Sequence, residues 1–290
     1  MRSYFKRLCE FSSLYQAWRA ISKTNKFSHG FDEITIEEFA RNCDKYLLDI
    51  KQQLQSRTFE FTPAREVLLD KDGGKKRPLK VPAVRDRVVL KAIELLVRDK
   101  FKKYSLDCSF GYIQGRSVPQ AIAEVRKLHE GGLQSVLEGD ISKFLDTVDR
   151  TLLIDRFTRE LRVTSLNALI KNALHVEIGN RQWFTPTERE LFPAADSGIP
   201  QGGILSPLLA NFYLYPFDKA MTDGGYHLVR FADDFVVMCP TPESARAAYQ
   251  MCCEVLEGNL KLKIHHLGEQ ESKTKITLFS KGFTFLLNLA

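Results

Sequence analysis

The chain has 290 residues, of which 44% are hydrophobic, enough for a sizeable core and more than one folding unit. Its apolar runs fall far short of the roughly 20 residues of a membrane-spanning helix, and its basic start lacks the apolar stretch of a secretion signal. These features exclude membrane-spanning and secreted classes and predict a cytoplasmic protein. Residues 1–132 carry a net charge of +9 and residues 133–290 a net charge of −3, which favours a polyanion as partner, although a solvated basic surface explains the charge better when it is taken alone.

The six cysteines and six histidines predict neither a zinc site nor a disulfide framework. No two cysteines form a C-x-x-C pair, and the adjacent His265 and His266 would point to opposite faces of a strand. We therefore expect reduced structural thiols and no zinc.

Helical spacing of apolar residues predicts one helix from Tyr4 to Trp18 and another from Ile34 to Leu54. Residues 61–84 read as two strands around a Gly-Gly hairpin turn, and residues 86–101 return to a helical period.

A further helix is expected to begin at Ser117, with this serine as the N-cap. Gln120 follows three residues later and would complete a capping box. Gly115 and Arg116 would therefore lie at a helix entrance.

From residue 133 onward the pattern alternates between apolar strands and helices. It predicts, in order, a strand ending at Asp140, helices to about residue 178, a glycine-rich turn with a long helix (197–221), a hairpin (226–240), a helix from Pro242, and strands at 261–266 and 274–280. This order matches a ferredoxin-like βαββαβ layout.

Asp233 and Asp234 stand in the turn of the predicted hairpin, between two apolar runs, and Asp140 ends the first strand of the same sheet. Adjacent carboxylates beside a core repel each other and lose hydration. Divalent cations relieve that repulsion, and a pair of them promotes phosphoryl transfer. Because every expected ligand is an oxygen, Mg²⁺ is favoured over zinc.

Six blocks of sequence, taken in order, resemble the reverse transcriptases and within them the bacterial group II intron type. The blocks are "GKKRPLKVPAVRDRVV", "SFGYIQGRSVPQAI", "GDISKFLDTVD", "SGIPQGGILSPLLANFYL", "VRFADDFVV" and "SKTKITLFSKGFTFL". The stretch "TNKFSHGFDEITIEEF" is similar to the family's N-terminal signature, although Glu33 replaces a usual glycine.

The resemblance implies an α+β right-hand polymerase fold. Residues 1–132 would form an N-terminal extension and fingers built from helices and a β-hairpin, and residues 133–290 a ferredoxin-like palm with an antiparallel sheet. The implied activity is RNA-directed DNA synthesis with two Mg²⁺ ions, for which Mn²⁺ can substitute.

The resemblance also assigns the catalytic residues. Asp140 and Asp233 would hold the metal ions, with Asp234 as the third carboxylate and the Ile141 carbonyl as a further ligand. Lys273 would protonate the leaving pyrophosphate, and Lys275 is the rival position.

The nucleotide-binding residues follow from the same resemblance. Lys75 and Arg77, at the fingers hairpin, suit the triphosphate, with Lys76 beside them, although for Lys75 and Lys76 a solvated turn remains the alternative. Gln201 and Gly202 would pack against the nucleotide and the template.

Phe144 and Leu145 would line the ribose of the incoming nucleotide. The family usually has Phe or Tyr where this chain has Leu145, which predicts weaker exclusion of ribonucleotides. Arg116, with Gly115 and Ser117 at the helix entrance, would contact a phosphate of the template.

The chain ends where the family's primer-gripping hairpin begins, so no thumb is expected, and a fragment is favoured over a compact form that relies on partners. The expected partners are an RNA template with a DNA primer, dNTPs, and either structured intron RNA or a CRISPR or phage-defence partner. A maturase-like RNA-binding scaffold without polymerase activity is the alternative function. The residues leave intron mobility, CRISPR and defence roles open.

Overall fold

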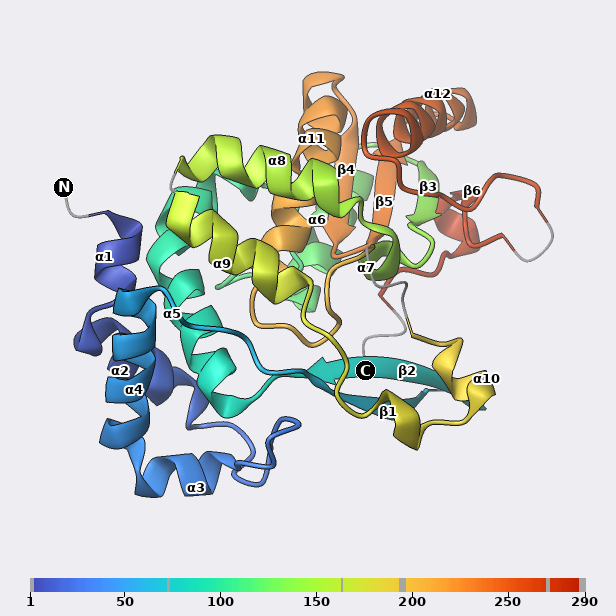
Figure 1. Ribbon diagram of the computed structural model, residues 1–290. Helices are drawn as coiled ribbons and strands as arrows, with labels where there is room; N and C mark the ends of the chain where they lie inside the picture. Colours follow the sequence, from blue (N-terminus) through green and yellow to red (C-terminus); the bar gives the residue numbers. More distant parts are fainter. Residues whose placement is uncertain (1–2, 72–73, 163, 193–196, 270–271, 287–290) are drawn as a thin grey trace. The chain divides into compact units, whose positions relative to one another are not determined.

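The computed structural model describes residues 3–71, 74–162, 164–192, 197–269 and 272–286 (Figure 1). The chain divides into two compact units, one of residues 1–100 with 150–207 and one of residues 101–149 with 208–290. This division groups the residues differently from the predicted boundary after residue 132. The assignment of segments to fingers and palm stays a prediction.

The first unit is mainly helical and carries one β-hairpin. Its elements are α1 (Tyr4–Leu8), α2 (Phe11–Ile21), α3 (Ile36–Arg41), α4 (Cys43–Ser56), β1 (Arg65–Lys71), β2 (Lys75–Val81), α5 (Val84–Phe101, whose last residue falls in the second unit), α8 (Arg150–Leu161), α9 (Thr164–Leu174), η3 (Arg181–Trp183) and α10 (Pro186–Arg189).

Both helices predicted near the N-terminus are in fact pairs of helices. The first prediction covers α1 and α2, with a break at Cys9 and Glu10, and the second covers α3 and α4, with a break at Asn42. Asn42 has φ −127° and ψ 31°, outside the α-helical range. The apolar spacing continues across each break, so periodicity alone does not reveal it.

The predicted hairpin and the helix after it are confirmed. Strands β1 and β2 pair antiparallel from Arg65 with Val81 to Lys71 with Lys75. Gly74, in the turn, has φ +72°, a conformation that glycine adopts without strain, whereas Gly73 lies outside the described residues. Helix α5 then begins at Val84, two residues before the predicted start.

The second unit contains a sheet with helices on both faces. Its elements are η2 (Lys102–Tyr104), α6 (Val118–Glu130), β3 (Ser135–Asp140), α7 (Phe144–Thr147), α11 (Ser206–Asp223, whose first two residues fall in the first unit), β4 (His227–Phe231), β5 (Asp234–Cys239), α12 (Pro242–Cys253), the π-helix η4 (Glu254–Asn259), β6 (Lys275–Leu278) and η5 (Phe279–Lys281).

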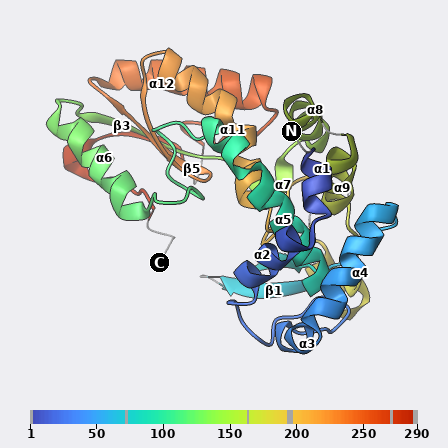
Figure 2. The same ribbon diagram turned by 90° about the vertical axis from the view of Figure 1, so that its left-hand side faces the viewer.

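The sheet has the strand order β4-β5-β3-β6, and all its pairings are antiparallel. This is the order of a ferredoxin-like βαββαβ unit, so the predicted fold class is confirmed. Helix α12 packs on β3, β5 and β6, and α6 packs on β4 and β5, with the sheet between the two helices (Figure 2). Beyond β6, the described residues as far as Leu286 contain no helical thumb.

The strand predicted at residues 261–266 is wrong. The segment makes only one isolated bridge, between Ile264 and Ile141. Lys261, at its start, has φ 54°, a left-handed conformation that interrupts an extended strand.

The capping box predicted at α6 is also wrong. The Ser117 hydroxyl donates to the Gln120 side-chain oxygen at 3.1 Å instead of accepting a backbone N–H, and the serine makes no side-chain cap bond. The helix nevertheless begins at Val118, next to the predicted cap.

No helix in the described part of the chain has both the length and the apolar character that crossing a membrane requires.

Candidate active site

Three carboxylates lie at one edge of the four-stranded sheet. Asp140 is the last residue of β3 and pairs with Asp234, the first residue of β5. Asp233 precedes it in the turn between β4 and β5, here called the acidic turn (Ala232 and Asp233). The Asp233 carbonyl accepts the N–H of Ile141 at 3.4 Å, which joins this turn to the residue after β3. Two neighbouring strands therefore bring all three aspartates together.

These carboxylates act on one another electrostatically. The pKa of Asp234 is raised to about 6, chiefly by burial, and the negative charges of Asp140, Asp233 and Glu138 add to the rise. A hydrogen bond from the Leu286 N–H to Asp234 Oδ2 (3.0 Å) opposes it. Such a group of acidic oxygens gains from a hard divalent cation, so its chemistry fits Mg²⁺ or Mn²⁺.

Lys273 contacts the cluster of three aspartates. Its Nζ lies 3.0 Å from Asp140 Oδ2, whereas Lys275 pairs with Glu138 in the strand register. Between the two rival positions, the contact favours Lys273. His265 also approaches Asp140, with 3.5 Å from Nε2 to Oδ2, a contact that the sequence did not suggest.

Phe144 and Leu145 differ in their exposure. Phe144 is 1% exposed, so its ring belongs to the core and offers no face to a nucleotide. Leu145 is half-buried and remains the candidate for contact with a ribose.

Arg116 is engaged within its own unit. Its guanidinium donates to the carbonyls of Leu106 and Ser109 and to the Asp107 carboxylate at 3.0 Å. Gly115, just before it, has φ +83°. These contacts of Arg116 stabilise the segment 106–109 before α6. They do not support the predicted role of Arg116 at a template phosphate.

In the first unit, two predicted nucleotide-binding segments touch. Arg77 Nε, in β2, donates to the Gln201 side-chain oxygen at 2.6 Å, and the Lys80 N–H donates to the Gln201 carbonyl at 3.0 Å. Gly202, which follows, has φ +82°, a value that favours glycine. The β1–β2 hairpin and the "PQGG" turn are thus in contact.

Two lysines, Lys75 and Lys76, precede Arg77 in β2. Lys76 Nζ contacts Glu188 Oε1 of α10 at 2.8 Å, so it is ion-paired and not merely solvated. Lys75 begins β2, and its side chain lies outside the described part of the structure.

Cys253, Glu257 and His266 have ligand atoms within 4.8 Å of one another, a group that sequence spacing did not predict. The histidine already has partners within the protein: its Nδ1 makes a hydrogen bond of 2.8 Å with the Tyr249 hydroxyl, and its Nε2 lies 3.3 Å from Glu257 Oε1. The group is therefore accounted for without an ion, and the expected lack of zinc stays a prediction.

Sequence reasoning also missed Arg230 and Asp218, which form a fully buried ion pair next to the acidic turn. The only signal was one charge next to apolar residues in each of two segments, Arg230 in "HLVRF" and Asp218 in "NFYLYPFD".

Comparison with known proteins agrees with this geometry. The family described as reverse transcriptase (RNA-dependent DNA polymerase) matches residues 69–286. Protein YkfC of Escherichia coli K12 is 32% identical over 278 residues, which cover 82% of this chain and 69% of YkfC. The group II intron-encoded protein LtrA of Lactococcus lactis subsp. cremoris is 31% identical over 171 residues, which cover 59% of this chain and 27% of LtrA.

Among solved structures, a chain of a partial Cas6-RT-Cas1–Cas2 complex has a TM-score of 0.50 and 24% identity. The match covers 90% of this chain and 43% of the other, and it supports the same fold. This chain thus spans less than half of that protein and about a quarter of LtrA. With the family matched over most of its length and with its aspartates gathered at one sheet edge, the chain belongs to the reverse transcriptases, the family of RNA-dependent DNA polymerases.

Proposed function

We propose that this chain is the polymerase core of an RNA-directed DNA polymerase, which joins a deoxynucleoside triphosphate to the 3′-hydroxyl of a DNA primer paired with an RNA template. The observation that carries the proposal is the convergence of Asp140, Asp233 and Asp234 at one sheet edge, where burial, with the charges of Asp140 and Asp233, raises the pKa of Asp234. A scaffold that only bound a polyanion would gain nothing from these charges.

Asp140 and Asp233 would hold two Mg²⁺ ions, with Asp234 and the Ile141 carbonyl beside them. Bound there, the ions would lower the pKa of the primer hydroxyl and neutralise the charge that develops on the phosphates. The raised pKa of Asp234 and its bond to Leu286 suit a supporting carboxylate better than a primary ligand.

In the reaction, the primer 3′-hydroxyl would lose its proton to water, its oxygen would form a bond to the α-phosphorus, and the bond from that phosphorus to the leaving pyrophosphate would break. Lys273 would give a proton to the pyrophosphate. Its side chain is 62% exposed and its ammonium contacts Asp140, so the lysine lies beside the aspartates and is accessible to a ligand. General acid catalysis of this kind contributes about 10²- to 10⁴-fold.

Arg77 and Gln201 would bind the incoming nucleotide, the arginine through its triphosphate. Their hydrogen bond places a fixed cation beside the "PQGG" turn, where Gly202 permits close backbone approach. Lys76 would join the triphosphate on leaving Glu188.

Primer extension tests the proposal. The chain is given a DNA primer annealed to an RNA template, dNTPs and Mg²⁺, and is compared with Asp233→Asn and with Asp223→Asn. Asp223 is exposed in α11 and paired with Lys219, so the second variant makes the same chemical change away from the site. We expect Asp233→Asn to lose at least about 100-fold in rate and Asp223→Asn to extend normally. Equal extension by all three chains would overturn the proposal.

A maturase-like RNA-binding scaffold is the second candidate, and similarity to a group II intron-encoded protein favours it. Structured intron RNA would then be the partner, whereas likeness to a Cas6-RT-Cas1 chain raises a CRISPR or defence partner instead. Tight binding of RNA by this chain without primer extension would select the scaffold.

A further inference from the structure

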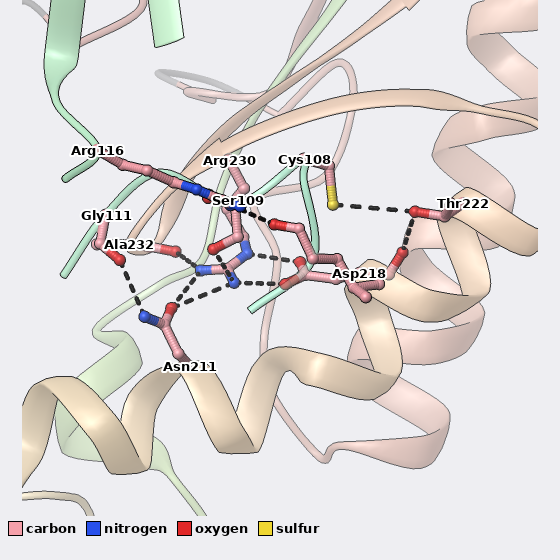
Figure 3. Close-up of polar contacts among 10 residues, drawn as sticks. Cys108, Ser109, Gly111, Arg116, Asn211, Asp218, Thr222, Arg230 and Ala232 are labelled. Atoms are coloured by element: carbon pink, nitrogen blue, oxygen red, sulfur yellow. Dashed lines mark hydrogen bonds and ion pairs between the residues drawn. The ribbon is translucent and has the colours of Figure 1, made fainter. Parts of the chain in front are cut away.

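A buried ion pair contacts Ala232 of the acidic turn through Arg230 (Figure 3). Arg230 of β4 and Asp218 of α11 are both 0% exposed, and the guanidinium meets the carboxylate with two hydrogen bonds of 2.6 Å, from Nε and from Nη2. Burying two charges is unfavourable unless their geometry is good and their remaining hydrogen bonds are made.

The guanidinium makes all of those bonds. Nη1 donates to the Ala232 carbonyl at 2.8 Å and to Asn211 Oδ1 at 3.2 Å, and Nη2 also donates to Ser109 Oγ at 2.7 Å. Each of the five N–H groups of the arginine therefore has an acceptor. The planar fork can satisfy four separate residues at once, which a lysine ammonium cannot do.

One of these acceptors belongs to the acidic turn itself. Ala232 has φ 59°, a left-handed conformation that is unfavourable for a residue with a Cβ. Its carbonyl and the N–H and Cα of Asp233 lie in one planar peptide group. The hydrogen bond from Arg230 to the Ala232 carbonyl therefore fixes the backbone nitrogen and Cα of Asp233, and the Asp233 side chain extends from that Cα.

The segment around Gly111 supports the turn from another side. The Arg230 N–H donates to the Cys108 carbonyl, and the Phe110 N–H donates to the Arg230 carbonyl, each at 2.8 Å. Asn211 Nδ2 donates to the Gly111 carbonyl at 2.9 Å. Arg230 thus joins the acidic turn to α11 and to this segment.

We propose that Arg230, anchored by Asp218, is a positioning residue that holds the acidic turn so that Asp233 presents its carboxylate for metal binding. This inference rests on the proposed function. If the ion pair served stability alone, then restoring stability without the bond to Ala232 would restore the site.

The decisive variant is Asp218→Leu/Arg230→Met. It removes both charges together, so no buried charge is left alone, and apolar replacement of a buried pair is often tolerated by the fold. The matched control is Lys219→Gln/Asp223→Asn, which removes an exposed ion pair from the same helix. Thermal unfolding, Mn²⁺ binding by electron paramagnetic resonance, and single-nucleotide addition are measured for each chain.

We expect the apolar double variant to unfold cooperatively near the temperature of the unmodified chain, yet to bind Mn²⁺ at least about 10-fold more weakly. Its kcat should fall by about 100-fold, the effect of a displacement of roughly 1 Å at a reacting group, while KM for the nucleotide changes little. Raising the Mg²⁺ concentration should recover part of the rate. The control should match the unmodified chain in every measurement.

Normal Mn²⁺ binding and normal kcat in the folded double variant would overturn the inference. If that variant does not fold, Arg230→Lys decides, because it keeps a cation for Asp218 and loses the fork that reaches Ala232. Mn²⁺ binding and turnover at the level of the unmodified chain in Arg230→Lys would also overturn the inference. Mn²⁺ binding is read without turnover, so a chain that binds Mn²⁺ but never extends a primer contradicts the proposed function and still tests the positioning.

Discussion

The backbone of Gly111 lies so close to the acidic turn that no side chain fits between them. A Cβ at this position would lie 2.3 Å from the Ala232 nitrogen and 3.0 Å from the Phe231 carbonyl carbon. Since both neighbours are backbone atoms, Gly111→Ala must displace the turn. We expect a loss of about 1–3 kcal/mol in the free energy of unfolding, and slower nucleotide addition.

Gly258→Ala is the control for that substitution, because a Cβ there meets no atom within 4 Å. Urea denaturation and primer extension on both variants should show an effect for Gly111 alone. A Gly111→Ala chain that unfolds and extends as the unmodified chain does would mean that the acidic turn tolerates displacement.

We predict that the side chain of Leu145 affects how well the enzyme discriminates between ribonucleotides and deoxynucleotides. Leu145→Phe restores the ring that the family usually has there and should lower the ratio of ribonucleotide to deoxynucleotide incorporation by about 10-fold, since added bulk collides with a 2′-hydroxyl. Leu145→Met, of similar volume, is the control. Single-nucleotide incorporation measures the ratio, and an unchanged ratio in Leu145→Phe would rule out this role.

At the level of single residues, the sequence pointed to the three aspartates but not to the buried ion pair of Arg230 and Asp218 beside them. Asp140, Asp233 and Asp234 stand out because charges interrupt apolar strands. Arg230 and Asp218 interrupt apolar segments too, but their partners lie up to 121 residues apart in the chain, and no local pattern reveals such a network.

Among the elements, the start of α5 carries a titratable group in the core. Asp86 is 1% exposed, and its pKa is raised from 3.8 to about 7, mainly by burial, with the nearby Asp32 adding to the rise and Arg85 opposing it. The folded chain therefore keeps a proton that the unfolded chain loses between about pH 4 and pH 7. The free energy of unfolding should fall across that range as pH rises, by up to about 1.4 kcal/mol per pH unit, and level off above it.

Asp86→Asn should remove this slope. An asparagine oxygen can still accept the Thr62 N–H, which donates to Asp86 Oδ2 at 2.9 Å. Urea denaturation at about pH 5 and about pH 8 gives the comparison, because other titrating groups contribute equally to both chains. Parallel pH dependences in the two chains would contradict the burial of a protonated Asp86.

Elements were predictable where local chemistry decides them. Continuous apolar runs in "HLVRF" and "DFVVMC" predicted β4 and β5, and the Gly-Gly turn predicted β1 and β2. Apolar and polar residues alternate in the segment 261–266, but Lys261 takes a left-handed conformation after the π-helix ends at Asn259, and no strand pairing follows. Apolar alternation permits a strand, and backbone context decides whether one forms.

For the whole chain, the sheet order could be predicted because a ferredoxin-like unit follows from the order of its elements. The compact units could not, because residues 150–207 leave the sheet and pack with residues 1–100. Such a return depends on contacts between distant apolar faces, which composition does not specify.

The charge of the whole chain sets how it should hold nucleic acid. The net charge is +6, with +9 in residues 1–132 and −3 in the rest. Contacts between cations and phosphates release counterions, so the logarithm of the dissociation constant for a primer–template should rise linearly with the logarithm of the salt concentration, by about 0.7–0.9 for each contact. Fluorescence anisotropy at several KCl concentrations measures this slope, and Lys127→Gln/Glu124→Gln, which removes an exposed ion pair without changing the net charge, should share it. A flat dependence would mean that apolar and stacking contacts dominate binding, and the basic front half would then be no more than a solvated surface.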